Sequence, residues 1–221
     1  MGLGLRIVRA TPARRLPLHS SQPRLRPSQG FRRGYAVDLR SVSRGHHQQI
    51  LHPDIDTHRI GIWGISQAGW IIPIVAARAP ELDFAIIVSG PLTTLSEENY
   101  FSSLTGEGAE VPKRSRAEIA ALMKAHKPTG FDPIPFVRQM RIPSVWIFGG
   151  NDDSVPVDES IDALHALQKE GYAFELAWFP MGNHQLWETS DWSRQYAPLI
   201  HRYVPHYFDT TLRWVLVLSN R

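Results

Sequence analysis

The 221-residue sequence contains no cysteine, which excludes a disulfide framework, thiolate catalysis and a cysteine-ligated zinc site. Long apolar runs are missing too, since no stretch of eighteen apolar residues is present that could span a membrane. The apolar core of a signal peptide is likewise absent. These absences lead us to expect a cytoplasmic protein with no membrane partner.

Acidic residues are scarce at the start of the chain. Residues 1–45 hold ten arginines and one acid, Asp38, so that 14 basic and 20 acidic residues remain elsewhere. The formal net charge of +3 therefore hides a mildly acidic body, which predicts no nucleic-acid partner. Residues 1–33 match either an Arg-rich transit peptide or a disordered arm. Their four prolines favour the arm, because proline breaks an amphipathic helix.

The most informative motif is Gly64-Ile65-Ser66-Gln67-Ala68-Gly69. An apolar, β-prone run precedes it at 59–63, and residues 70–77 follow with apolar side chains on all sides, as in a buried helix. Strand, Gly-flanked serine and helix together form a nucleophile elbow, in which small residues allow a strained turn that presents the hydroxyl. Taken alone, the motif also fits an ordinary strand-to-helix turn.

An acid and a histidine follow two later strands. The apolar run 143–148 leads into Gly149-Gly150-Asn151-Asp152, and the run 173–179 leads into Gly182-Asn183-His184. Parallel strands place their carboxyl ends at one edge of a sheet, so Ser66, Asp152 and His184 are expected to meet there. The Gly182-Asn183 pair is expected to give the histidine loop backbone freedom.

These motifs resemble those of the α/β-hydrolase family, specifically its serine esterases and peptidase-like hydrolases, over about residues 34–215. The resemblance implies an α/β fold with a mostly parallel central sheet flanked by helices and with shortened or missing N-terminal strands. The hydrolase domain would occupy 34–221, after the arm 1–33. The resemblance also makes Ser66 the nucleophile, His184 the base, and Asp152 rather than Asp153 the acid, with no cofactor and no metal.

The oxyanion hole is the weak point of this resemblance. One backbone donor falls on Gln67, at the start of the helix after the elbow. The family takes the other from a His-Gly turn, for which the only candidate here is 16–21, with Ser20 in place of glycine. The next family strand, at 34–40, is also cut short. We expect an incomplete oxyanion hole, modest activity, and an unprotected sheet edge that favours a homo-oligomer.

An insertion with helical patterning occupies about residues 92–142, and its clearest helix covers 117–123. The resemblance implies a lid that walls the acyl pocket, whereas the simpler alternative is a connection that covers the sheet edge. Trp70 and Trp187 are candidates for the substrate pocket, although aromatic residues near a core usually serve packing. The alternating His and Asp residues at 52–58 have the spacing of possible metal ligands. Pro53 and the turn-forming aspartates instead favour a loop that leads into the elbow strand.

Two classes of function stay open on the sequence. The first is a serine hydrolase that cleaves small carboxylic esters through an acyl-enzyme on Ser66, with an amidase or peptidase as its near alternative. The second is a weakly active or non-catalytic relative that keeps the three residues without a complete oxyanion hole.

Overall fold

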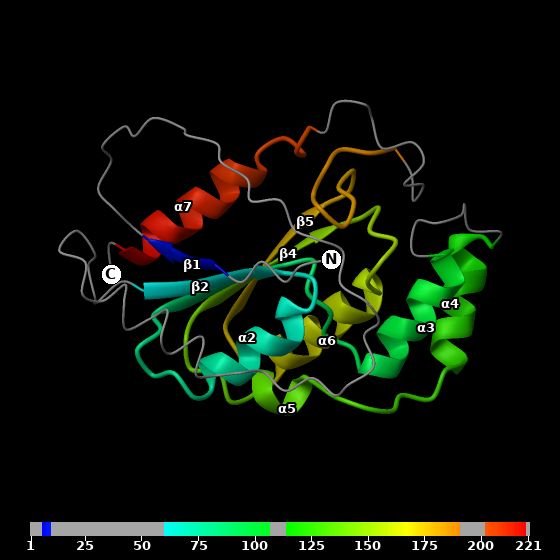
Figure 1. The fold of residues 1–221 in the computed structure, drawn as a ribbon, viewed down its shortest axis with the longest axis horizontal. Coiled ribbons are helices and arrows are strands. Elements are labelled where there is room, and N and C mark those ends of the chain that lie inside the picture. The colour runs from blue at the N-terminus through cyan, green and yellow to red at the C-terminus, as the bar shows by residue number, and fades with distance from the viewer. Residues whose placement is uncertain (1–5, 10–59, 107–113, 191–201, 220–221) are drawn as a thin grey trace, which may run out of the picture.

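A computed structural model of the chain describes residues 6–9, 60–106, 114–190 and 202–219 (Figure 1). Five strands form one sheet in the order β1-β2-β3-β4-β5. Their bounds are β1 (Arg6–Arg9), β2 (Ile60–Ile65), β3 (Phe84–Val88), β4 (Ser144–Gly149) and β5 (Phe174–Phe179). The helices are α2 (Ala68–Ala76), α3 (Leu95–Thr105), α4 (Arg116–Ala125), α5 (Ile134–Val137), α6 (Val157–Lys169) and α7 (Tyr207–Ser219).

Strands β2 to β5 are parallel, whereas β1 pairs antiparallel with β2. In the register of the parallel strands, one residue of each strand pairs with one residue of the next, so that these residues lie level across the sheet. They are Ile65, Val88, Ile147 and Ala177. The loops that follow these four residues therefore leave the sheet at the same edge. This edge is where ligands bind in open α/β sheets.

Each face of the sheet is covered by helices. One apolar core joins the sheet to α2 and α6, through residues such as Ile72 and Leu164, both 0% exposed. The other joins the opposite face to α7, where Phe84 packs edge-on against Trp214. Figure 1 shows this arrangement, with α2, α5 and α6 below the sheet and α7 above it. The predicted parallel sheet with flanking helices is confirmed.

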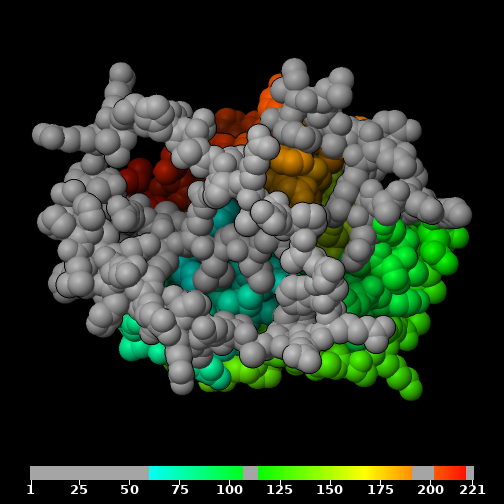
Figure 2. Space-filling view, viewed as in Figure 1, coloured from blue at the N-terminus to red at the C-terminus, as the bar shows by residue number. Residues whose placement is uncertain are grey.

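The insertion between β3 and β4 contains α3, α4 and α5, and α4 covers the helix predicted at 117–123. Both longer helices begin at a capping box, Thr94 with Glu97 and Ser115 with Glu118, which satisfies two backbone donors reciprocally. The two helices share a small core of their own: Phe101, Leu104, Ile119 and Met123. The pair forms one end of the molecule (Figure 2).

Several sequence predictions lie outside the described residues: the donor at Ser20, the strand at 34–40 and the loop at 52–58. Within the described part of the chain, the N-terminal edge of the sheet is β1, which pairs only with β2. Association through an open strand edge stays a prediction. None of the described helices has the length and apolar character needed to cross a bilayer.

Candidate active site

Ser66 lies directly after β2 in a strained backbone conformation. Its φ of 63° is left-handed, a region that residues with a Cβ rarely adopt. The Ser66 N–H continues the parallel ladder by donating to Val88 O at 2.9 Å, and Ser66 O accepts from the Gly69 N–H at 2.9 Å. The chain thus turns from strand into α2 within two residues, which is the geometry of a nucleophile elbow.

Close packing behind the elbow explains Gly69. A Cβ at this position would stand 2.5 Å from the carbonyl carbon of Gly90, which follows β3. Two glycines on neighbouring segments therefore let α2 approach the sheet at the point where Ser66 is held. Any larger side chain would push the elbow away from β3.

Asp152 follows β4 and is held by its own turn. The residue is 2% exposed, and Oδ1 accepts from the N–H groups of Ser154 at 2.8 Å and Val155 at 3.0 Å. Oδ2 lies 2.9 Å from Nδ1 of His184. Because an ionised carboxylate only accepts hydrogen bonds, this contact places the ring proton on Nδ1, so Nε2 is the unprotonated nitrogen that can act as a base.

His184 lies in the loop after β5 and is 4% exposed. The preceding Asn183 fixes this loop, since its Oδ1 accepts from the N–H groups of Gln185 and Trp187, both at 3.0 Å. The expectation that Gly182-Asn183 supplies backbone freedom is therefore wrong. Gly182 does not adopt a positive φ, and Asn183 ties the loop together through its side chain.

The loops that carry Asp152 and His184 are bonded to each other. The N–H groups of Gly150 and Asn151 donate to Phe179 O and Gly182 O, both at 2.8 Å. Asn151 Nδ2 also donates to Thr189 O at 2.8 Å. The loops of Asp152 and His184 consequently form one hydrogen-bonded unit at the carboxyl ends of β4 and β5.

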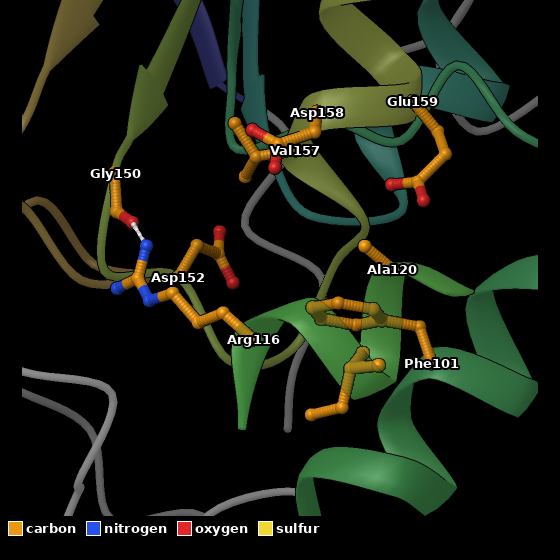
Figure 3. A pocket seen from close by; sticks show the side chains of 9 residues that line it. Phe101, Arg116, Ala120, Gly150, Asp152, Val157, Asp158 and Glu159 are labelled. Carbon is orange, nitrogen blue, oxygen red and sulfur yellow. Dashed lines mark hydrogen bonds between the residues drawn. The ribbon is translucent and has the colours of Figure 1, made fainter. Parts of the chain in front are cut away.

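A small pocket of about 40 Å³ opens beside this unit, between α4 and α6 (Figure 3). Arg116 of α4 crosses it and donates to Gly150 O at 3.0 Å. Asp158 and Glu159 line its α6 side. Burial is the main cause that raises the pKa of Glu159, and the nearby Asp158 and Glu97 raise it further. Arg116 is exposed as a residue, but partial desolvation of its guanidinium lowers the pKa of Arg116, and the negative charge of Asp158 partly offsets this.

The two aromatic candidates have different surroundings. Trp70 is 6% exposed, packs edge-on against Phe131, and donates from Nε1 to Thr93 O at 3.1 Å. These contacts are sufficient to explain it as a packing residue. Trp187 is partly buried in the histidine loop and pairs with Tyr203 through an isolated β-bridge. A role for either residue in substrate binding stays a prediction.

Asp153 is buried as well, but the carboxylate 2.9 Å from His184 Nδ1 is that of Asp152. Its Oδ1 lies 3.4 Å from Ser154 Oγ, and its backbone carbonyl accepts from Thr105. Gln67 precedes α2, and within the described residues no carbonyl accepts from its N–H. No group of three or more His, Cys, Asp or Glu side chains that could hold a metal is found in the described part of the chain.

Sequence reasoning missed the supporting roles of Asn151, Asn183 and Arg116. The two asparagines stand next to the acid and the histidine in the motifs themselves, so their position was a usable signal. Arg116 stands 36 residues before Asp152 on another element. No local pattern marks such a residue.

The fold and the elbow together define an α/β-hydrolase of the serine-hydrolase superfamily. More narrowly, the chain belongs to the prolyl oligopeptidase family, whose profile matches residues 42–210. That match includes Ser66, Asp152 and His184. A search of curated protein sequences finds no match.

Solved structures with low sequence identity share the fold. An acylaminoacyl peptidase in complex with Z-Gly-Gly-Phe-chloromethyl ketone superposes with a TM-score of 0.54 at 19% identity, over 83% of this chain and 27% of its own. Porphyromonas gingivalis dipeptidyl peptidase 4 superposes with a TM-score of 0.50 at 17% identity, over 82% of this chain and 22% of its own. A Pyrococcus furiosus esterase superposes with a TM-score of 0.51 at 15% identity, over 81% of this chain and 60% of its own. The chain thus spans about a quarter of the length of the two peptidases.

Proposed function

We propose that the protein is a serine hydrolase that cleaves small carboxylic esters. The observation that carries the proposal is the buried Asp152–His184 pair, 2.9 Å apart, at the same sheet edge as a serine in the strained elbow conformation. A buried acid bonded to a histidine orients the imidazole and stabilises its protonated form.

The reaction follows from these roles. His184 Nε2 takes the proton of Ser66 Oγ as the oxygen attacks the carbonyl carbon of the ester. The Gln67 N–H donates to the oxyanion that forms. His184 then returns the proton to the leaving alcohol, and water releases the acyl group from Ser66 by the same steps. A missing second oxyanion donor would cost about 3–4 kcal/mol of transition-state stabilisation, so we expect modest turnover.

Peptide or amide cleavage is the second candidate. It is favoured by membership of the prolyl oligopeptidase family and by the likeness to two peptidases, although the esterase shares the fold equally well. The chemistry on Ser66 is the same for both bonds. An amide has the poorer leaving group, so it needs the complete oxyanion hole more than an activated ester does.

A fluorophosphonate probe tests the proposal, because it labels only a serine whose base and oxyanion donor are in place. We expect labelling of the native chain, no labelling of Ser66→Ala, and loss of p-nitrophenyl acetate hydrolysis in that variant with unchanged circular dichroism. Ser89→Ala, at the end of the neighbouring strand, is the matched control. Equal turnover by native chain and Ser66→Ala would reject the assignment. Ester and anilide substrates with the same acyl group then distinguish esterase from amidase.

A further inference from the structure

The turn that carries the acid, residues 149–155, is held from two sides. One side bonds to the histidine loop, as described above. On the other side, α3 donates from Ser102 Oγ to Ser154 O at 2.9 Å and from Thr105 Oγ1 to Asp153 O at 2.6 Å. The carbonyl groups of this turn are thus bonded by side chains of the helical insertion.

Arg116 of α4 contacts the part of the turn that precedes Asp152. Its guanidinium donates from Nη1 to Gly150 O at 3.0 Å (Figure 3). Nη2 donates to Asn151 Oδ1. Gly150 and Asn151 are the two residues directly before Asp152. A planar guanidinium presents two N–H groups in a fixed geometry, so it orients both acceptors at once.

Asn151 extends this contact to the histidine loop. Its amide accepts from Arg116 on one end and donates to Thr189 O at 2.8 Å on the other. The side chain is 6% exposed, so its orientation is closely determined by these partners. The chain of contacts therefore runs from α4 through one amide to the loop that carries His184.

We propose that Arg116 is a positioning residue for the hydrolytic reaction, through which the insertion keeps Asp152 aligned with His184. This inference rests on the proposed function, because it assigns a part of the same site. The insertion is then a support of the catalytic acid, in addition to any role as a lid. Displacement of α4 would weaken catalysis without any change in Ser66, Asp152 or His184.

Three variants separate this role from the alternatives. Arg116→Ala removes both hydrogen bonds and the charge, whereas Arg116→Lys keeps the charge and can satisfy one acceptor. The lysine variant carries the test independently of whether the alanine variant folds. Arg114→Ala, on an exposed arginine two residues earlier, is the control and should retain native activity.

The decisive measurement is the direction in which the pKa of His184 changes in the variants, determined by NMR without substrate. Loss of the aligned carboxylate destabilises the imidazolium, so we expect a fall of about 0.5 to 1 in Arg116→Ala and a smaller fall in Arg116→Lys. Loss of the positive charge alone would raise this pKa instead, since Asp152 on the acid turn and Asp158 and Glu159 on α6 line the same pocket. A rise, or no change, in both variants would overturn the proposal.

Kinetics supply the second readout. With p-nitrophenyl acetate, kcat should fall about tenfold to a hundredfold in Arg116→Ala, with KM little changed and partial recovery in Arg116→Lys. A rise in KM at constant kcat would contradict positioning. The two proposals fail separately. A fall in the His184 pKa without labelling of Ser66 rejects only the hydrolase, whereas a labelled native chain with unaltered His184 pKa in the variants rejects only Arg116.

Discussion

Ser66, Asp152 and His184 are each placed by a different local cause. The ladder bond to Val88 and the close approach of Gly69 to Gly90 hold the serine in its left-handed conformation. Two N–H groups of its own turn hold the aspartate. The histidine depends on its neighbour Asn183. Each of the three is therefore sensitive to changes at a residue that does no chemistry itself.

The two adjacent aspartates provide a test at this scale. Asp152→Asn should keep the shape of the turn but favour the wrong tautomer of His184, so we expect kcat to fall by about three to four orders of magnitude. Asp153→Asn should have a much smaller effect, because Asp153 bonds locally to Ser154. Steady-state kinetics on both variants shows which substitution lowers kcat more, and thermal denaturation is the folding control. A larger loss at Asp153 would reverse the assignment.

At the scale of elements, the site depends on how closely the ends of β4 and β5 approach. A Cβ on Gly149, the last residue of β4, would stand 2.4 Å from Gly182 O in the histidine loop. The two loops can therefore form their hydrogen bonds only with glycine at this position. The packing of two strand ends decides the Asp152–His184 distance.

Gly149→Ala should accordingly separate the two loops. We expect a loss of about 1–3 kcal/mol of unfolding free energy from overpacking, and a fall in kcat of at least about tenfold from the displaced acid. Urea denaturation and ester hydrolysis measure the two effects.

The matched control is Gly171→Ala, which has a φ of 96° and no atom within 4 Å of the added Cβ. This variant should lose about 1–2 kcal/mol through backbone strain and keep native kcat. Native activity in Gly149→Ala would show that the two loops adjust freely, contrary to the structure.

For the whole molecule, stability should depend on pH through the acids between α3 and α6. Burial raises the pKa of Glu159 above its ordinary value of 4.5, so the native state binds this proton more tightly than the unfolded chain does. The contribution of Glu159 to stability is therefore present below pH 4.5 and is lost as the pH rises through the folded-state pKa.

Glu159→Gln cannot ionise, so the variant does not lose stability as the pH rises through the folded-state pKa of Glu159. We expect the variant to be more stable than the native chain at pH 7 by about 0.5 kcal/mol, a small value because the side chain is partly exposed and screened by solvent. The difference should disappear near pH 4. Urea denaturation across this range measures it, with Glu175→Gln on the exposed side of β5 as the control. A native chain that is the more stable at pH 7 would contradict the burial of Glu159.

Much of the architecture was predictable because its determinants are local. The apolar runs, the glycines and prolines that interrupt them, and the helical patterning of the insertion placed β2 to β5, α2 and α4 within a few residues. The order of the strand ends then brought a serine, an aspartate and a histidine to one edge. The choice of Asp152 over Asp153 came from the resemblance of the turn after Gly149 to the acid turn of the family, and in the structure Asp152 Oδ2 lies 2.9 Å from His184 Nδ1.

The sequence by itself thus determined the type of each element and which strand ends carry polar residues, since these depend on neighbours along the chain. Only the tertiary structure decided what those residues touch. It packed Trp70 against Phe131, tied the histidine loop through Asn183, and placed Arg116 on the turn before Asp152. These contacts join elements that lie far apart in sequence, and their geometry follows from the packing of helices and loops against the sheet, which no short motif encodes.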